Sequence, residues 1–210
     1  VTTSFSVMNE SLSLPAPAPA IRPYGLALSH QARAMIKGQR PRCLWLTGFS
    51  GAGKSTLANA LELYLHQFGL HTFLLDGDNV RSGLCRDLGM GDGCRRENIR
   101  RMAEVARLMV DAGLIVIVAA ISPFRAEREA ARRLFAQEDF IEVHVSTSLQ
   151  VCARRDPKGL YQAVREGRIS NFTGVDSPYE PPLSAECRID TEALELPEAC
   201  QQLAALLLKK

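Results

Sequence analysis

The sequence has no run approaching the roughly 18 consecutive apolar residues that a membrane-spanning helix requires, so we expect no membrane partner. Its first residues contain neither a basic stretch nor an apolar segment after it, which argues against a secretory signal peptide. The 25 Lys and Arg residues nearly balance the 23 Asp and Glu residues, so the formal net charge of +2 gives no reason to expect nucleic acid as a partner. The six cysteines form no C-x-x-C pair and no zinc-like spacing, which favours a reduced, cytoplasmic chain.

The first 23 residues differ in composition from the rest of the chain. They include the low-complexity run LPAPAPA, which should be extended and semi-rigid. We therefore expect residues 1–23 to form a disordered arm. Residues 24–210 are enough for one domain with a sizeable core.

In this domain, segments with the apolar pattern of strands alternate with segments that have the period of helices. Residues 114–121, LIVIVAAI, are apolar throughout, as in a strand buried on both faces. Gly113 ends the helix before this strand, Ser122 and Ser148 are predicted N-caps, and Pro123 is expected at the first position of its helix. The alternation predicts a three-layer α/β/α fold with a five-stranded parallel sheet. Strands are expected at residues 42–47, 71–75, 114–121, 140–145 and 186–190, and helices at 29–38, 55–68, 96–112, 123–137, 149–155 and 196–210.

The motif GFSGAGKST stands between a predicted strand and a predicted helix, which is the setting of a phosphate-binding P-loop. Its glycines let successive backbone N–H groups face inward as an anion nest, and the helix N-terminus adds partial positive charge. Lys54 is expected to reach the β- and γ-phosphates of a nucleotide, and Ser55 to bind Mg²⁺. The residues predicted to bind the nucleotide here are Gly48, Phe49, Ser50, Gly51, Ala52, Gly53, Lys54, Ser55 and Thr56.

Two acids, Asp76 and Asp78, follow the second predicted strand. Because ligands of parallel sheets bind at the carboxyl ends of the strands, these acids should share a crevice with the P-loop. Two carboxylates beside a P-loop suit Mg²⁺ binding and activation of a hydroxyl nucleophile. The N-K-x-D motif usual in GTPases is absent, and the long apolar strand does not end in the Asp usual in motor ATPases. The sequence therefore favours a small-molecule kinase.

A cluster of basic residues that spans 21 residues of the chain follows these acids. Arginine side chains match phosphate and sulfate oxygens bidentately, so the cluster suggests an acceptor that is itself anionic. Some of these arginines could equally be solvated helix charges paired with neighbouring glutamates. The cluster consists of Arg81, Arg95, Arg96, Arg100 and Arg101, with Asn98 among them.

Six stretches resemble the adenylyl-sulfate kinase (APS kinase) family in their order and spacing, from Ser29 to the C-terminus. They are GFSGAGKST, DGDNVRSGLCRDLG, RENIRR, ISPFRAER, RDPKGLY and FTGVDSPYEPP. The resemblance implies a P-loop kinase fold and the phosphorylation by ATP of the 3′-hydroxyl of adenosine 5′-phosphosulfate (APS), with Mg²⁺. The products would be PAPS and ADP, in sulfate activation.

The resemblance also implies roles for the residues that match each motif. Asp78 is expected to be the base or the Mg²⁺-side carboxylate, with Asp76 holding the acceptor. Ser122 matches a position described in the family as a phosphoserine intermediate. Positioning and electrostatics suffice for phosphoryl transfer, however, and a simple helix cap is the alternative role. The residues expected to bind the acceptor are Asp76, Asp78, Asn79, Arg81, Arg95, Asn98, Arg101, Ile121, Ser122, Lys158 and Phe172.

Residues from about 156 to 184 are expected to form a mobile lid over the nucleotides, because they are polar and rich in Pro and Gly. The resemblance implies that, within this segment, Lys158 reaches the phosphates and Phe172 stacks on the adenine of APS. Just before it, Arg154 or Arg155 is expected to stack on the adenine of ATP.

Two residues depart from the family pattern and put the acceptor affinity in doubt. Met90 stands where Phe is usual, and Cys94 stands where Asp is usual. Two other functions stay open: a P-loop kinase for another small anionic acceptor, and a non-catalytic nucleotide-binding module. We also expect a homodimer, and the arm could contact ATP sulfurylase.

Overall fold

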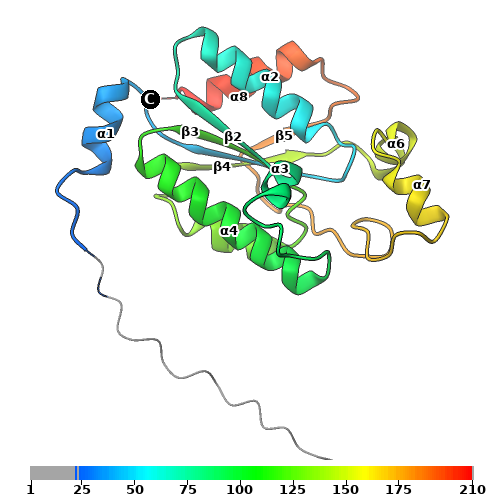
Figure 1. The fold of residues 1–210 in the computed structure, drawn as a ribbon. Helices are drawn as coiled ribbons and strands as arrows, with labels where there is room; N and C mark the ends of the chain where they lie inside the picture. Colours follow the sequence, from blue (N-terminus) through cyan, green and yellow to red (C-terminus); the bar gives the residue numbers. More distant parts are fainter. Residues whose placement is uncertain (1–21, 23, 210) are drawn as a thin grey trace, which may run out of the picture.

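The computed structural model describes residues 22 and 24–209, and apart from Arg22 the predicted arm lies outside the described residues. The five parallel strands that the sequence predicts form one sheet, and the structure gives their order as β2-β3-β1-β4-β5 (Figure 1). The strands are β1 (Cys43–Thr47), β2 (Thr72–Asp76), β3 (Ile115–Ala119), β4 (Phe140–Val145) and β5 (Cys187–Ile189). The helices are α1 (His30–Lys37), α2 (Lys54–Gln67), α3 (Gly77–Ser82), α4 (Asp92–Asp111), α5 (Arg125–Arg132), α6 (Leu149–Arg155), α7 (Leu160–Arg165) and α8 (Leu196–Leu207).

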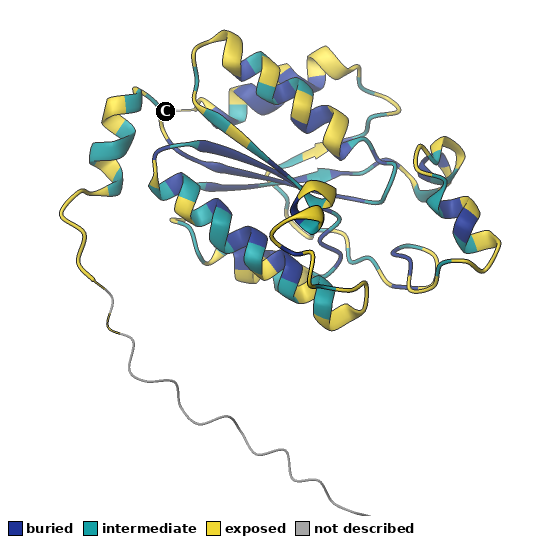
Figure 2. Ribbon diagram, viewed as in Figure 1, coloured by how far each residue is buried: buried dark blue, intermediate teal, exposed yellow. Residues whose placement is uncertain are grey.

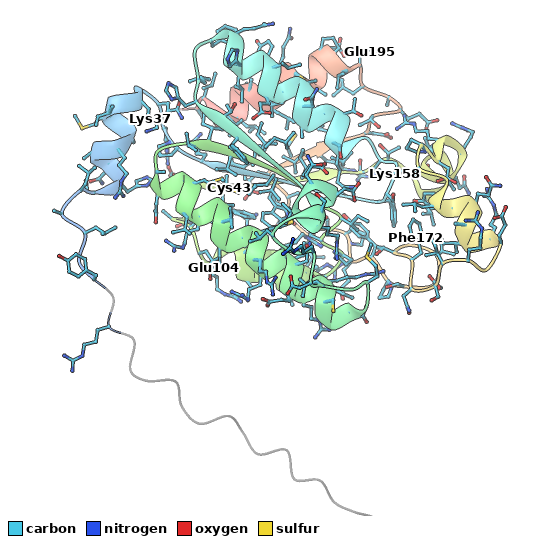
Figure 3. All side chains as sticks on the ribbon, in the orientation of Figure 1. Lys37, Cys43, Glu104, Lys158, Phe172 and Glu195 are labelled. Carbon is cyan, nitrogen blue, oxygen red and sulfur yellow. The ribbon has the colours of Figure 1, made fainter. Side chains whose placement is uncertain are left out.

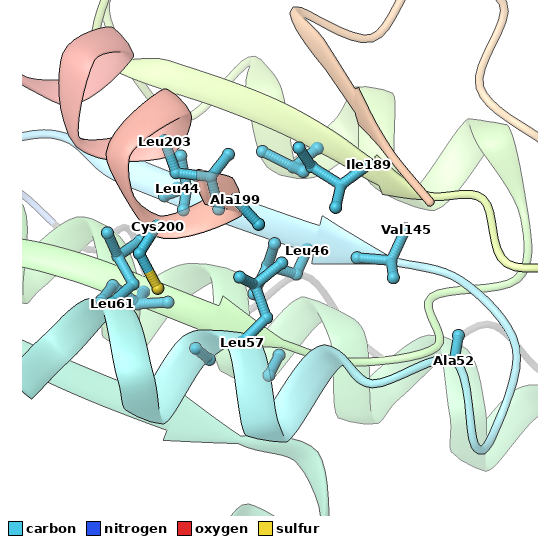
Figure 4. Close-up of a cluster of buried hydrophobic side chains, with 14 of the residues drawn as sticks. Leu44, Leu46, Ala52, Leu57, Leu61, Val145, Ile189, Ala199, Cys200 and Leu203 are labelled. Carbon is cyan, nitrogen blue, oxygen red and sulfur yellow. The ribbon is translucent and has the colours of Figure 1, made fainter. Parts of the chain in front are cut away.

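Each face of the sheet is covered by a pair of helices, which gives the predicted three layers. Helices α2 and α8 pack side by side over one face, and α4 and α5 pack together over the other (Figure 1). Successive side chains of a strand point to opposite faces, so the central strands are apolar in both directions. In β1, Leu44 and Leu46 join the cluster under α2 and α8 (Figure 4). Cys43 and Trp45 of the same strand join the cluster under α4.

Burial follows this layering. The strands β1 and β3 are buried along their whole length, and the helices α2, α4 and α8, which cover the sheet, each have a buried side and an exposed side (Figure 2). All six cysteines are free thiols. Within the described part of the chain, no helix combines the length and the apolarity needed to cross a membrane.

Several predicted helix ends are confirmed. The side chain of Ser148 caps α6 by accepting a hydrogen bond from the amide of Val151 at 3.4 Å. Ser29 caps α1 in the same way, through the amide of Ala32 at 3.1 Å. Gly113 has φ of +91° and donates its N–H to the carbonyl of Val110, which ends α4.

The predicted cap at Ser122 is wrong. Its side chain accepts a hydrogen bond from the buried indole of Trp45 and caps no helix. Helix α5 begins only at Arg125, with Phe124 at the N-cap position and Pro123 still outside the helix. Strand β3 correspondingly ends at Ala119, two residues before the predicted end at Ile121. The residues between β3 and α5 form a wall of the site described below.

Two short helices were missed. Helix α3 follows β2 directly, with the side chain of Asp76 as its cap. Helix α7 lies inside the segment 156–184, which was expected to bury little. That expectation is wrong for part of the segment, because Tyr161, Ala163 and Phe172 are buried. Helices α6 and α7 lie beyond the end of the sheet that is opposite to α1 (Figure 1).

Candidate active site

A cavity of about 880 Å³ lies at the carboxyl ends of the strands. This is the place where ligands of open parallel sheets bind, and its size suits a small-molecule site. Most of the residues predicted from the sequence line it together. These are Ser50, Gly51, Gly53, Lys54, Ser55, Thr56, Asp76, Asp78, Arg81, Arg95, Asn98, Ile121, Ser122, Arg155, Lys158 and Phe172.

Five predicted residues do not line the cavity: Gly48, Phe49, Ala52, Asn79 and Arg101. The first three belong to the P-loop and shape it from behind. Ala52 is fully buried, and its carbonyl accepts a hydrogen bond from Thr191 at 2.9 Å. Arg101 is instead held by Glu97 at 3.0 Å, which is the helix ion pair considered as its alternative role, and by Asp87 before α4 at 2.7 and 2.8 Å.

The P-loop is curled by glycines at positions where a side chain would collide. Gly48 has φ of +149°, and a Cβ there would lie 2.4 Å from the carbonyl oxygen of Val145. Gly53 has φ of +95° and is the N-cap of α2, with no side-chain cap hydrogen bond to the first turn. The free N–H groups and the positive end of the helix dipole therefore point at the same spot, which suits a phosphate.

Lys54 lies at the centre of this loop, with only 8% of its surface exposed. Its Nζ donates hydrogen bonds to the carbonyls of Gly48 at 2.9 Å and Phe49 at 2.7 Å. Burial lowers the pKa of Lys54 to about 8, because the charged form has lost much of its hydration. The ammonium group of Lys54 is therefore held against the loop, and it loses its charge as the pH rises above about 8.

The two acids have different partners. Asp76 accepts hydrogen bonds from Ser55 Oγ at 2.6 Å and from the amide of Asp78 at 3.0 Å. Asp78 instead forms an ion pair with Lys158, which comes from the loop between α6 and α7. Figure 3 shows Lys158 and Phe172 at the end of the molecule away from Lys37. The side chains of Asp78 and Lys158 are 68% and 50% exposed, so the pair is easily separated.

The hydroxyl of Ser55 and the carboxylate of Asp76 are oxygen donors of the kind that Mg²⁺ prefers. Among the described residues, no group of three or more His, Cys, Asp or Glu side chains comes together in a way that could hold a metal ion. A cation here would therefore need oxygens from a ligand as well, which is how Mg²⁺ is usually held in nucleotide sites.

The basic side of the cavity is built by α3 and α4. Arg95 reaches across to the loop after α7, where it contacts Ser177 Oγ at 3.1 Å, Thr173 Oγ1 at 3.3 Å and the carbonyl of Asn171. Arg81 binds the carbonyl of Gly89 at 3.1 Å, and burial lowers its pKa. Asn98 is buried, and its Oδ1 has no hydrogen-bond partner although the residue lines the cavity. A buried acceptor without a partner is costly unless a ligand or water satisfies it.

Ser122 lies in the wall of the cavity in an uncommon conformation. Its φ is +40°, which costs a residue other than glycine on the order of 1–3 kcal/mol. The residue is 1% exposed, and its Oγ accepts a hydrogen bond from Trp45 Nε1 at 3.0 Å. The hydroxyl is therefore turned away from solvent and engaged by the core.

Phe172 is in the cavity wall and packs edge-on against Tyr161, with ring centroids 4.9 Å apart. Tyr161 in turn donates its hydroxyl hydrogen to the carbonyl of Ser50 in the P-loop at 2.9 Å. These contacts connect the segment after α7 to the phosphate loop. Met90, the first departure from the family pattern, lines the cavity and is 63% exposed, whereas Cys94 does not line it.

Thr191 is a site residue that the sequence analysis missed. It follows β5 and lines the cavity. Its Oγ1 accepts a hydrogen bond from Arg155 at 2.7 Å and contacts Thr147 Oγ1 at 2.9 Å. Its position directly after the carboxyl end of a predicted strand was the signal that could have found it.

Comparisons with known proteins agree on one family. Residues 40–190 match the family described as adenylylsulphate kinase. The adenylyl-sulfate kinase of Shewanella sp. strain ANA-3 is 59% identical over 181 residues, covering 86% of this chain and 87% of the relative.

Two solved structures extend this likeness. A Mycobacterium tuberculosis APS kinase, CysC, in complex with AMPPNP and APS superposes with a TM-score of 0.78 at 44% identity, covering 81% of this chain and 99% of that one. A hexameric APS kinase from Thiobacillus denitrificans superposes with a TM-score of 0.61 at 33% identity, covering 81% of this chain and 29% of that one.

Proposed function

This chain belongs to the adenylylsulphate kinase family, and from that premise we propose how its own residues carry out the reaction of the family. The enzyme transfers the γ-phosphoryl group of ATP to the 3′-hydroxyl of APS, giving PAPS and ADP. The observation that carries this function is the identity of 59% over 86% of the chain. The cavity supports this function, because a phosphate-binding loop, two acids and several arginines line it together.

ATP binds with its phosphates on the P-loop. The N–H groups at the start of α2 hold the phosphate oxygens, and Lys54 leaves the carbonyls of Gly48 and Phe49 to contact the β- and γ-phosphates. Arg155, held by Thr191, faces the other end of the nucleotide and stacks on its adenine.

Mg²⁺ would be held by Ser55 with a carboxylate and the phosphates of ATP, and it would supply neutralisation of the charge on the transferring group. The contact between Ser55 and Asp76 favours Asp76 as this carboxylate, rather than Asp78 as first expected. Asp78 is then free to act as the base that takes the proton of the 3′-hydroxyl. For this, Lys158 must leave Asp78 and contact the phosphates.

APS binds on the side of α3 and α4. Arg81 and Arg95 hold its phosphosulfate group. Asn98 Oδ1 accepts a hydrogen bond from APS, which gives this buried oxygen the partner that it otherwise lacks. Phe172 stacks on the adenine, and closure of the segment 156–184 excludes water from the transfer. Slower amide exchange in this segment with ADP and APS bound together would support the closure, and exchange already slow without ligand would contradict it.

The transfer is direct, from ATP to APS. The Oγ of Ser122 is buried and already accepts a hydrogen bond from Trp45, so it is poorly placed to attack a phosphorus atom. Mass spectrometry of the enzyme after incubation with ATP alone tests this statement. Stoichiometric phosphorylation of Ser122 that is chased into PAPS would contradict it.

The function itself is tested by a coupled assay of ADP release. ATP is supplied with APS, with AMP or with gluconate in separate reactions, and ADP release is expected with APS only. Faster release with AMP or gluconate would favour a kinase of another small acceptor. Omission of Mg²⁺ in the same assay tests the cofactor, since turnover should then be lost.

We propose in addition a homo-oligomeric enzyme in the cytoplasm. The hexamer of the related Thiobacillus denitrificans APS kinase and the six free thiols support these proposals. The homodimer predicted from the sequence is tested by light scattering of the purified chain. Contact of the residues 1–23 with ATP sulfurylase stays a prediction.

A further inference from the structure

Arg128, on the inner side of α5, is a buried charged residue that the reaction described above does not use. Its side chain is 3% exposed and does not line the cavity. Its charge is balanced by Glu142 of β4, whose Oε1 lies 2.6 Å from Arg128 Nε. A buried arginine is costly unless it is paired and hydrogen-bonded, and here each of the other two guanidinium nitrogens donates to a backbone carbonyl.

These carbonyls belong to two separate segments. Arg128 donates one hydrogen bond to the carbonyl of Ser122 at 2.6 Å and another to the carbonyl of Glu180 at 2.7 Å. Ser122 is the residue with φ of +40° in the cavity wall. Glu180 lies in the loop between α7 and β5, which also carries Phe172 and Ser177, the latter in contact with Arg95.

Further contacts fix the same two segments to each other. The amide of Glu180 binds the carbonyl of Pro123 at 2.8 Å, and the carboxylate of Glu180 accepts from the amide of Arg125 at 2.8 Å. Arg125 Nε also donates to the carbonyl of Pro181 at 2.7 Å. The cavity wall at residues 121–123 and the loop that contains Glu180 are therefore bonded to each other, and Arg128 makes the most deeply buried of these contacts.

We propose that Arg128 is a positioning residue for the acceptor APS, which it never touches. It holds Ser122 in its strained conformation and thereby fixes the cavity wall at residues 121–123, while its bond to Glu180 fixes the loop that carries Phe172. A strained backbone persists only where its surroundings hold it, and here the guanidinium and Trp45 do so. This inference rests on the proposed function, since it assigns the wall to the APS side of the site.

The test is Arg128→Lys, which keeps the positive charge beside Glu142. A single ammonium group cannot reproduce the planar fork that reaches Glu142 and both carbonyls at once. KM for APS should rise about tenfold, which corresponds to about 1.4 kcal/mol, while KM for ATP stays unchanged. The control is Arg42→Lys, because Arg42 is also a buried arginine that binds two carbonyls, those of Leu206 and Leu207, but far from the cavity. It should lower Tm without changing either KM.

A second readout needs no substrate. Trp45 is the single tryptophan, it is fully buried, and its Nε1 donates to Ser122 Oγ. Release of Ser122 in Arg128→Lys should therefore shift the tryptophan emission of the free enzyme to longer wavelength, and Arg42→Lys should not. If Arg128→Lys does not fold, Glu180→Ala removes the outer contact to Arg125 at the surface and should raise KM for APS in the same selective way, to a smaller extent.

Three results for Arg128→Lys would overturn the inference. The first is an unchanged KM for APS, and the second is a rise of KM that is equal for ATP and APS. The third is a rise of KM for APS alone without a shift of the Trp45 emission, which would exclude an effect through Ser122. A wild-type enzyme without APS-dependent ADP release would overturn the proposed function itself, and this inference with it. The wild-type assay thus separates the two failures.

Discussion

Lys54 offers the sharpest test of the phosphate site, because its charge can be removed or fixed with little change in shape. Lys54→Met keeps the unbranched side chain and removes the ammonium group. In the wild-type enzyme this group has only two carbonyl partners, at 2.9 and 2.7 Å, and burial has already lowered its pKa to about 8. Loss of the two bonds and relief from burying a charge oppose each other, so we expect little change in the free energy of unfolding.

The effect on the chemical step should be far larger. A preorganised donor aimed at the charge of a transition state contributes about 100- to 1000-fold to kcat. We therefore expect Lys54→Met to lose at least that much of kcat while its Tm stays close to that of the wild type. The assay is ADP release at saturating ATP and APS, with Tm measured on the same preparation. A variant that keeps more than about a tenth of kcat would refute the role of the lysine as a phosphate clamp.

The lowered pKa adds a dependence on pH with a definite sign. Below about pH 8 Lys54 is charged and attracts the polyphosphate, and above it the free enzyme holds a neutral amine. The ratio kcat/KM for ATP reports ionisations of the free enzyme, so it should fall as the pH rises through about 8. Lys54→Arg stays charged over this range, so its profile should lack this fall even if its activity is lower. An alkaline fall at the same pH in Lys54→Arg would assign the ionisation to another group.

Further predictions concern the acids, the arginines and a buried carboxyl group. Asp78→Asn should lower kcat about 100- to 10,000-fold with little change in KM for APS, as expected for a lost base; a larger loss of kcat in Asp76→Asn would reverse the roles of the two acids. Arg95→Ala should raise KM for APS and leave KM for ATP unchanged, because a charge-assisted contact worth about 1.5–3 kcal/mol is lost; Arg101→Ala, outside the cavity, is the matched control and should leave both unchanged. Burial raises the pKa of Glu127 to about 7, so the folded state holds a proton that the unfolded state releases, and stability falls as the pH rises from about 4.5 to 7. Glu127→Gln should therefore raise the free energy of unfolding by about 1–3 kcal/mol at pH 8 and much less at pH 5, and chemical denaturation at the two pH values checks this difference.

The Gly-rich motif and the acids of the second strand were recognisable without coordinates because their chemistry depends on local order along the chain. A P-loop needs a strand, a glycine turn and a helix in direct succession, and the residues 42–68 supply all three. The parallel sheet then follows from the alternation of strands and helices, and its geometry brings the strand ends to one edge. For these reasons the positions of Lys54, Ser55, Asp76 and Asp78 around one cavity were predictable.

What the sequence left undecided are the contacts between residues far apart in the chain. Ser122 was predicted as a cap from its place before Pro123, but the distant Trp45 offers its hydroxyl a buried partner, and that tertiary contact prevails over the local preference.

The same reason explains the other residues that were misjudged or missed. Arg101 resembles an anion-binding arginine in the sequence, yet Asp87 and Glu97 occupy its donors. Thr191 lies in no motif, and Arg128 closes the stretch ISPFRAER without any role that the pattern reveals. Both residues matter through hydrogen bonds to distant segments, which lie 36 residues from Thr191 and 52 residues from Arg128. Local order along the chain thus determined the fold and the chemistry of this protein. Tertiary packing decided which side chains are free to contact a substrate, because any hydrogen-bonding partner that folding brings within reach can occupy a polar group.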